Sequence, residues 1–412
     1  MPAATTDHAL NEGTRLLHRP GQLSRAGVLD VGLKCAHSCR FCYYSYLDGT
    51  DDQFRGIRQG SFRTEEDCRA ILAGFARQGF VNFDVTGGEP TLMPALPALV
   101  DYARRDLGLA ARVITLGQFL LRQRPGRGTL LDELLQAGLA DLLLSAHACT
   151  EESFRACTGG SWNTLSALMD ELDRRDFQFG ANTTVFADNF RSLPDIAQAL
   201  AAHGLYVQNY IFFNAYYGWR QDERAARVQS RYSEAYPHLR RAVELLDARG
   251  VAVNIRYVPL CVVPGLERHV VGAIGLAHDP FEWRNRACNH EAAPDFCSQA
   301  LEIPPSGVRE AHAYRPLDEA LPNGVRVTGM RGERFKLFTS ACQDCAAREA
   351  CDGIDPGYLA RHGDSEFTPY ADMALSGPLL KARLDYAPAF AVKLGGKAVM
   401  RTGMRDISGA ES

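Results

Sequence analysis

The sequence predicts an α/β fold in which parallel strands alternate with helices, followed by a smaller cysteine-rich region. From Gly27 to Phe213, short apolar runs rich in β-branched residues alternate with longer amphipathic stretches. This alternation stops near Pro259–Glu267, where proline and glycine become frequent. Five of the twelve cysteines then fall between Cys288 and Cys351. These observations place a large α/β unit before a small unit of different composition.

Six strand candidates share a short, nearly all-apolar composition, which is typical of parallel strands covered on both faces. They are Val28–Val31, Val81–Val85, Ala111–Leu116, Asp141–Ser145, Gly180–Val185 and Val207–Phe212. Five helix candidates lie between them, with apolar residues three and four positions apart. They are Thr64–Gln78, Leu96–Arg105, Thr129–Ala137, Thr164–Arg175 and Leu193–His203. A further helix is expected at Ser230–Arg249 and a further strand at Ala252–Val258.

The cysteine-rich region has too little apolar material for an independent core. It contains short strand-like pieces at Gly324–Thr328 and Arg334–Phe338, and small domains of this kind are usually stabilised by metal. Near the end, Ala389–Met400 is expected to form a closing strand or hairpin. We therefore expect four segments: an extension over 1–26, the α/β unit over 27–260, the cysteine-rich domain over 261–370 and a tail over 371–412.

The composition argues against several classes of partner. The chain of 412 residues carries 45 basic and 49 acidic side chains, a net charge of −4, which does not favour nucleic acid or a membrane surface. Hydrophobic residues make up 46% and charged residues 23%, values typical of a globular protein. No apolar run reaches the roughly 18 residues of a membrane helix, and residues 1–33 lack the apolar core of a signal peptide. We expect a cytoplasmic protein.

The first cysteine group directly follows the first strand. Cys35, Cys39 and Cys42 lie within eight residues, in a loop at the carboxyl end of a parallel strand, where α/β barrels build active sites. Three thiolates at this spacing can hold three irons of a [4Fe–4S] cube and leave the fourth iron open. The alternatives are a zinc site completed by His37, or three buried thiols that happen to lie close together.

The Cys-x3-Cys-x2-Cys motif, with Phe41 before its last cysteine, resembles the radical S-adenosylmethionine (radical SAM) superfamily. The resemblance implies a partial (β/α)6 TIM-like barrel with a small C-terminal iron–sulfur domain. It also implies a [4Fe–4S] cluster whose open iron binds S-adenosylmethionine (SAM). Reductive cleavage of SAM then gives a 5′-deoxyadenosyl radical that abstracts a hydrogen atom from the substrate.

Further residues follow the later strands. Gly87, Gly88 and Glu89 come after the second strand and resemble the superfamily's motif for the amino group of SAM, although such a sequence can also be an ordinary strand-to-helix turn. Ser145 and Asn182 occupy positions from which the superfamily often contacts the ribose or carboxylate of SAM, but either could simply bind nearby backbone. Where many relatives have Thr-Asn-Gly, this chain has Thr115-Leu116-Gly117, so a polar contact expected there is absent or moved.

The second cysteine group, Cys342-x2-Cys345-x5-Cys351, resembles the auxiliary-cluster extension called SPASM or its shorter form, Twitch. Two auxiliary clusters need seven or eight thiolates, more than this region supplies, so we expect one auxiliary [4Fe–4S] cluster. Its expected ligands are these three cysteines with Cys288 or Cys297. A Twitch-like set of Cys288, Cys297, Cys342 and Cys345 is the alternative. A structural zinc site is also open, and His290 or His362 could join it.

The remaining cysteines are single. Cys261 follows the last barrel strand, and some radical SAM epimerases use a cysteine there or nearby to return a hydrogen atom to the substrate radical. The more common role of such a residue is a small buried side chain. Cys68, Cys149 and Cys157 are expected to be structural.

The substrate is the least determined part of the prediction, because loops set it. Only about 34 residues precede Cys35, too few for the leader-binding module of many peptide-modifying relatives, so a small-molecule metabolite or natural-product intermediate is favoured. The alternatives are a SPASM-type peptide maturase, transfer of an aminocarboxypropyl group from SAM, and a non-catalytic iron–sulfur or zinc protein. A flavodoxin- or ferredoxin-type electron donor is the expected partner.

Overall fold

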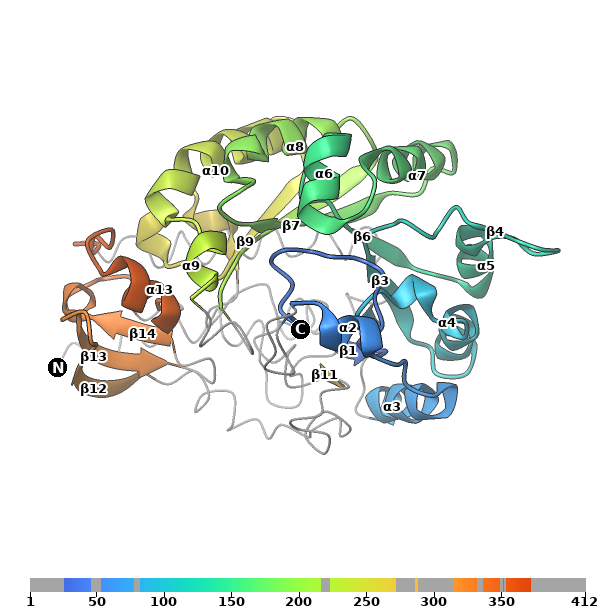
Figure 1. Cartoon of the computed structure of the whole chain (residues 1–412), viewed down its shortest axis with the longest axis horizontal. Coiled ribbons are helices and arrows are strands. Elements are labelled where there is room, and N and C mark those ends of the chain that lie inside the picture. The colour runs from blue at the N-terminus through green and yellow to red at the C-terminus, as the bar shows by residue number, and fades with distance from the viewer. Residues whose placement is uncertain are drawn as a thin grey trace, which may run out of the picture.

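The computed structural model describes residues 26–45, 53–77, 82–215, 223–271, 286–287, 314–331, 336–348, 351 and 353–371. Within these ranges, the chain forms one large parallel sheet, a small antiparallel sheet and a two-stranded hairpin (Figure 1). The strand expected at Ala389–Met400 and most of the expected terminal segments lie outside the described residues.

The large sheet contains nine strands among the described residues, in the order β10-β9-β8-β7-β6-β3-β2-β1-β11. All neighbouring pairs in it are parallel. The strands are β1 (Ala26–Asp30), β2 (Asn82–Thr86), β3 (Ala110–Thr115), β6 (Asp141–Ser145), β7 (Phe179–Val185), β8 (Leu205–Phe212), β9 (Ala252–Arg256), β10 (Val270–Val271) and β11 (Arg286–Ala287). The predicted α/β fold is confirmed, and the seventh strand expected at Ala252–Val258 joins this sheet as β9.

Most of the helices form an arc on the outside of the sheet, and the loop after β1 and the short helix α2 (Arg55–Gln59) lie inside the arc (Figure 1). The other helices that accompany this sheet are α3 (Glu65–Arg77), α4 (Leu96–Arg105), α5 (Leu130–Ala137), α6 (Glu151–Thr158), α7 (Trp162–Arg174), α8 (Leu193–Leu200), α9 (Ala225–Val228) and α10 (Tyr232–Asp247). A short hairpin of β4 (Gln123–Arg124) and β5 (Gly128–Thr129) precedes α5. None of the described helices is both long and apolar enough to cross a membrane.

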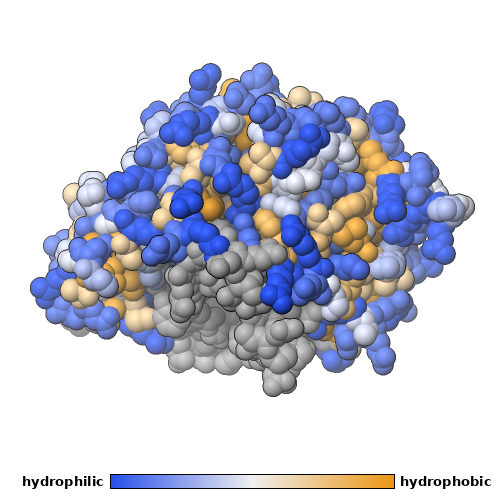
Figure 2. Space-filling model, viewed as in Figure 1, coloured by the Kyte–Doolittle hydropathy of each residue, from blue (hydrophilic) through white to orange (hydrophobic). Residues whose placement is uncertain are grey.

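Helix α5 illustrates how the sequence specifies these crossovers. The Thr129 hydroxyl accepts from the Asp132 N–H, while the Asp132 carboxylate accepts from the Thr129 N–H, which forms a capping box. Gly138 ends the helix with φ 90°, a conformation that glycine adopts without strain. Leu130, Leu131 and Leu134 are buried between these caps and form the apolar stripe of the helix. Hydrophilic residues cover much of the surface seen in Figure 2.

Helix α6 is the main element that the sequence analysis did not predict. The Thr150 hydroxyl caps its start by accepting from the Ser153 N–H, and Gly159 ends it in the left-handed conformation. Its buried apolar residues are Phe154 and Cys157. Two apolar positions do not form a periodic pattern long enough to predict a helix from the sequence. The helix forms because both of its ends are capped.

A buried polar network lies on the inner face of the sheet. Asp84 of β2 and Arg112 of β3 are register partners, and their side chains form two hydrogen bonds of 2.6 Å. Arg112 also neighbours Asp141 of β6 in register, and Asp141 accepts a 2.5 Å hydrogen bond from the Tyr206 hydroxyl. The network joins four strands through charges that are largely removed from water.

The small sheet consists of β12 (Tyr314–Ala320), β13 (Arg326–Arg331) and β14 (Lys336–Thr339), followed by helix α13 (Pro356–His362). β13 and β14 correspond to the two expected strand-like pieces, whereas β12 was not expected, because its side chains are mostly exposed and polar. The region packs on the start of α10. The Tyr358 hydroxyl accepts from the Tyr232 N–H at 2.9 Å, and the two rings stack at 4.0 Å. The exact limits expected for the four segments remain a prediction.

Candidate functional site

The loop that carries Cys35, Cys39 and Cys42 is fixed by the end of helix α6. The N–H of Ser38 donates to the carbonyl of Thr158 at 2.8 Å, and the N–H of Arg40 donates to the carbonyl of Cys157 at 3.0 Å. Within the loop, the N–H of Cys42 donates to the carbonyl of Cys39. The loop is therefore shaped by backbone hydrogen bonds to an element that the sequence analysis missed.

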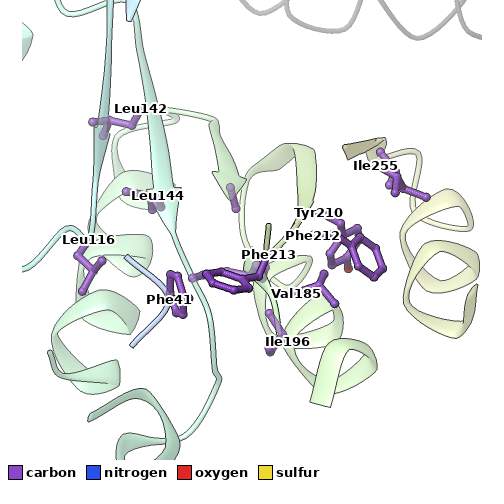
Figure 3. Close-up of a cluster of buried hydrophobic side chains, with 14 of the residues drawn as sticks. Phe41, Leu116, Leu142, Leu144, Val185, Ile196, Tyr210, Phe212, Phe213 and Ile255 are labelled. Atoms are coloured by element: carbon purple, nitrogen blue, oxygen red, sulfur yellow. The ribbon is translucent and has the colours of Figure 1, made fainter. Parts of the chain in front are cut away.

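Phe41 packs into the barrel core. It is 8% exposed, and its ring centroid lies 4.4 Å from that of His147 and 4.8 Å from that of Phe186. Figure 3 shows it in the same cluster of buried side chains as Leu116, Leu144 and Phe213. This position makes Phe41 the anchor of the cysteine loop. The contact between Phe41 and the cofactor, which the resemblance implies, stays a prediction.

The three thiols are half-buried and close enough to affect one another. Burial raises the pKa of Cys35 to about 12, with further increases from Glu89 and Cys42. Burial also raises the pKa of Cys39 well above its usual value, with contributions from both other cysteines. A bound cation would favour the thiolate form of three such neighbouring thiols. The donor set therefore fits an iron–sulfur cluster.

The two glycines after β2 let this loop and the next one pack against each other. The N–H of Gly88 donates to the carbonyl of Gly32 at 2.7 Å, and the N–H of Glu89 donates to the carbonyl of Lys34 at 3.0 Å. A Cβ atom added to Gly88 would lie 2.3 Å from the Lys34 oxygen and 2.4 Å from that of Leu33. Glycine is required here by the approach of backbone to backbone.

The Glu89 carboxylate is buried at the centre of several hydrogen bonds. Its oxygens accept from the hydroxyl of Thr115 at 2.6 Å, from the N–H of Leu116 at 3.2 Å and from Thr91. Burial alone would raise its pKa, but the hydrogen bonds and the His37 ring, with Nε2 3.5 Å from Oε2, lower it overall. Glu89 is thus held as an anion, suited to accept from an ammonium group. Thr115, in the segment that departs from the Thr-Asn-Gly pattern, binds Glu89.

Ser145 and Asn182 belong to a row of polar residues across four strands. Ser145 of β6, Asn182 of β7, Asn209 of β8 and Asn254 of β9 are successive register partners. Asn254 Nδ2 donates to Asn209 Oδ1, and Asn209 Nδ2 donates to Asn182 Oδ1, both at 2.8 Å. The sequence analysis missed Asn209 and Asn254, although an asparagine inside an otherwise apolar strand is a detectable signal.

This row, which we call the amide row, lies on the inner face of the sheet. Its neighbours Tyr210 and Ile255 pack on the helix side, in the cluster that also contains Ile196 of α8 (Figure 3). Since successive residues of a strand point to opposite faces, the amides point inward. They offer uncharged donors and acceptors beside the cysteine loop's end of the barrel.

The second cysteine group lies around one cavity. Cys342, Cys345 and Cys351 line it together with Cys261, which comes from the short 3-10 turn Leu260–Val262 after β9. Burial raises the pKa of Cys261, and the other three cysteines raise it further. Cys288, Cys297 and His290 lie outside the described residues. His362 packs against the ring of Tyr358 at 4.6 Å.

Neither cysteine group has the geometry of a site for one ion. In the parts of the chain that the structure describes, no three or more His, Cys, Asp or Glu side chains are arranged around a single metal position. A [4Fe–4S] cube binds each thiolate at a different iron, so its ligands surround a larger volume than the ligands of zinc. The absence of a single-ion position among the described residues is thus compatible with ligands of a cluster.

Comparisons with known proteins agree with this geometry. The sequence model of the radical SAM superfamily matches residues 30–200. The PqqA peptide cyclase of Bradyrhizobium diazoefficiens is 28% identical over 207 residues, 49% of this chain and 49% of that protein. The GTP 3′,8-cyclase of Tolumonas auensis is 28% identical over 142 residues, 34% of this chain and 39% of that protein. The chain thus spans about half the length, or less, of these curated relatives.

One solved structure extends the likeness beyond the barrel. Streptococcus suis SuiB bound to S-adenosylmethionine superimposes with a TM-score of 0.52 and 12% identity, covering 84% of this chain and 76% of that chain. At this identity the likeness concerns the fold. The matched domain includes the cysteine loop, Glu89 and Asn182, and a cysteine-rich region follows it. Over residues 30–200 the chain is thus similar to the radical SAM superfamily, whose cofactors are a [4Fe–4S] cluster and S-adenosylmethionine.

Proposed function

We propose that this protein is a radical SAM enzyme that modifies a peptide. The observation that carries the proposal is the match to PqqA peptide cyclases, which extends over 49% of the chain. The sequence analysis favoured a small molecule because of the short segment before Cys35. The match to peptide cyclases supports the alternative of a peptide maturase better, so we adopt the alternative.

The chain's own residues provide the binding and positioning that such a reaction needs. When bound, the cluster and SAM supply an electron, and then a 5′-deoxyadenosyl radical that takes a hydrogen atom from the substrate. Cys35, Cys39 and Cys42 hold three irons and leave one for the amino and carboxylate groups of SAM. Glu89, fixed as an anion by Thr115 and Leu116, accepts from the ammonium of the methionine moiety.

The amide row supports a peptide as the second ligand. Asn182, Asn209 and Asn254 present side-chain amides whose donor and acceptor groups match those of a peptide backbone. Their mutual hydrogen bonds fix the side chains before any ligand arrives, which lowers the entropy cost of binding. Asn182 and Ser145 remain the proposed contacts to SAM, and the two further asparagines extend the row toward substrate.

A small-molecule substrate is the second candidate, since one relative is a GTP 3′,8-cyclase. That match covers 34% of the chain, a shorter stretch than the match to the peptide cyclases. The longer match favours a peptide substrate over a small molecule. A flavodoxin- or ferredoxin-type donor is part of the proposal, since SAM cleavage needs an electron.

The test compares substrates under anaerobic conditions. Protein reconstituted with iron and sulfide would receive SAM, dithionite and, in turn, GTP or each short peptide encoded beside its gene. We expect one peptide to increase 5′-deoxyadenosine formation and to change mass by loss of two hydrogens or by deuterium gained from D2O. The Cys35→Ala/Cys39→Ala/Cys42→Ala variant should give neither product.

Three outcomes would contradict the proposal. Conversion of GTP with no change in any peptide would return the function to the small-molecule class. Methylthioadenosine in place of 5′-deoxyadenosine would indicate aminocarboxypropyl transfer. Cleavage that survives in the triple variant would remove the radical SAM mechanism altogether.

A further inference from the structure

Four cysteines from two distant parts of the chain surround one cavity. Cys261 follows β9 at the end of the barrel, whereas Cys342, Cys345 and Cys351 come from the region after β14. The cavity is otherwise lined mainly by apolar side chains, among them Leu260. A hydrophobic shell of this kind shields a metal centre from water.

Each of the four sulfur atoms lies within hydrogen-bond reach of a polar group, and three of them accept from a backbone N–H. Cys345 Sγ accepts from the N–H of Tyr370 at 3.4 Å, and Cys351 Sγ accepts from the N–H of Gly353 at 3.4 Å. Cys342 Sγ lies 3.8 Å from the Thr339 hydroxyl, and Cys261 accepts from the N–H of Thr368. Hydrogen bonds from backbone N–H groups to sulfur stabilise thiolates and tune iron–sulfur clusters.

One short segment contacts both halves of the cavity. The N–H of Thr368 donates to Cys261, and the N–H of Tyr370, two residues later, donates to Cys345. The segment is fixed at its end, because the Tyr370 hydroxyl donates to the Leu260 carbonyl at 3.1 Å and to Glu267 Oε1 at 2.8 Å. The position of Cys261 relative to the later cysteines is therefore set by the fold.

We propose that Cys261 is the fourth ligand of the auxiliary [4Fe–4S] cluster, with Cys342, Cys345 and Cys351. Each thiol loses its proton as it binds one iron. The cluster then connects the end of the barrel to the cysteine-rich region. This assignment replaces both earlier expectations, the fourth ligand from Cys288 or Cys297 and the hydrogen donor at Cys261.

A cluster with four cysteine ligands has no open iron. The auxiliary cluster therefore cannot bind SAM or substrate directly, and its contribution is limited to electron transfer and to stabilising the region around it. The inference concerns the cluster alone and does not depend on whether the substrate is a peptide.

The test uses full-length protein that lacks the first cluster. In the Cys35→Ala/Cys39→Ala/Cys42→Ala background, reconstituted protein should contain about four irons and four sulfides. Adding Cys261→Ala should abolish this cluster or convert it to a three-iron cluster with its own EPR signal. Adding Cys149→Ala, another half-buried cysteine, or Cys288→Ala or Cys297→Ala should leave iron, sulfide and spectrum unchanged. An unchanged four-iron cluster in Cys261→Ala would overturn the assignment, as would zinc in place of iron.

A second measurement on the unmutated chain covers the case in which Cys261→Ala does not fold. Cysteine alkylation would be mapped by mass spectrometry in loaded protein and in protein stripped with a chelator. Cys261, Cys342, Cys345 and Cys351 should be protected together only when loaded, and Cys288 and Cys297 should react equally in both states. Equal reactivity of Cys261 in the two states, or protection of Cys288 or Cys297 by the cluster, would contradict the proposal.

Discussion

Replacing Phe41 with alanine tests whether the cysteine loop is held by packing into the barrel core. The ring is 8% exposed and lies against His147 and Phe186, at centroid distances of 4.4 and 4.8 Å. Removing a buried phenylalanine ring costs about 3 to 5 kcal/mol, because the contacts are lost and a cavity remains. Since Phe41 lies between Cys39 and Cys42, the same change should release the loop and impair assembly of the first cluster.

Urea unfolding and iron analysis would separate the two effects. The control is Phe179→Ala, because Phe179 is fully buried at the start of β7, at the opposite end of the strands from the cysteine loop. Both variants should lose similar stability, but only Phe41→Ala should fall from about eight irons to about four. Equal iron contents would refute the role of Phe41 as an anchor. A loss below about 1 kcal/mol would show that the ring is not packed as described.

Three further changes probe the same architecture. Gly88→Ala should lower iron content and 5′-deoxyadenosine formation, because its Cβ would lie 2.3 Å from the Lys34 oxygen. The control Gly108→Ala has open space around its Cβ but a φ of 67°, so it should lower stability by about 1 kcal/mol and leave iron content and product formation unchanged. Asp84→Asn should lower the free energy of unfolding in urea by about 1.5 to 3 kcal/mol, because it removes the carboxylate charge that accepts two hydrogen bonds from the largely buried Arg112 guanidinium. Burial lowers the pKa of His147 to about 3 in the folded protein, whereas the pKa of an unperturbed histidine is about 6.5. As the pH falls below about 6.5, the unfolded chain therefore takes up a proton that the folded protein does not, and the folded state loses stability. Between pH 7 and pH 5.5 the free energy of unfolding in urea should fall by about 1 kcal/mol, and this decrease should be absent in His147→Gln.

The barrel was predictable because its strands are covered on both faces. A strand such as Leu142–Leu144 within β6 is apolar on both sides, so composition alone marks it. Helices with a capping residue and a continuous apolar stripe, such as α5, were found at nearly their observed bounds. Helix α6 was missed because its stability comes from Thr150 and Gly159 at its ends, and caps without a stripe are weak signals.

The candidate site was predictable only where chemistry needs adjacent residues. The spacing of Cys35, Cys39 and Cys42 is recognisable in the sequence, and so is the position of Glu89 directly after the next strand. The roles of Thr115 and of Phe41 depend on which side chains the fold brings together, and no local pattern indicates them. Asn209 and Asn254 are intermediate cases, because their strands were predicted but the register that aligns them with Asn182 was not.

The two cysteine groups differ in predictability for a reason that follows from their chemistry. A cluster that must keep one iron open needs three ligands, and a single short loop can supply all three, so its spacing is visible in the sequence. A cluster with four protein ligands can take the last one from any cysteine that the fold brings within reach. Cys342, Cys345 and Cys351 form a local motif, but Cys261 joins them only because β9 ends where Thr368 and Tyr370 pass. The complete ligand set of a cluster with four protein ligands therefore depends on the tertiary structure, and the sequence motif identifies only three of the four ligands.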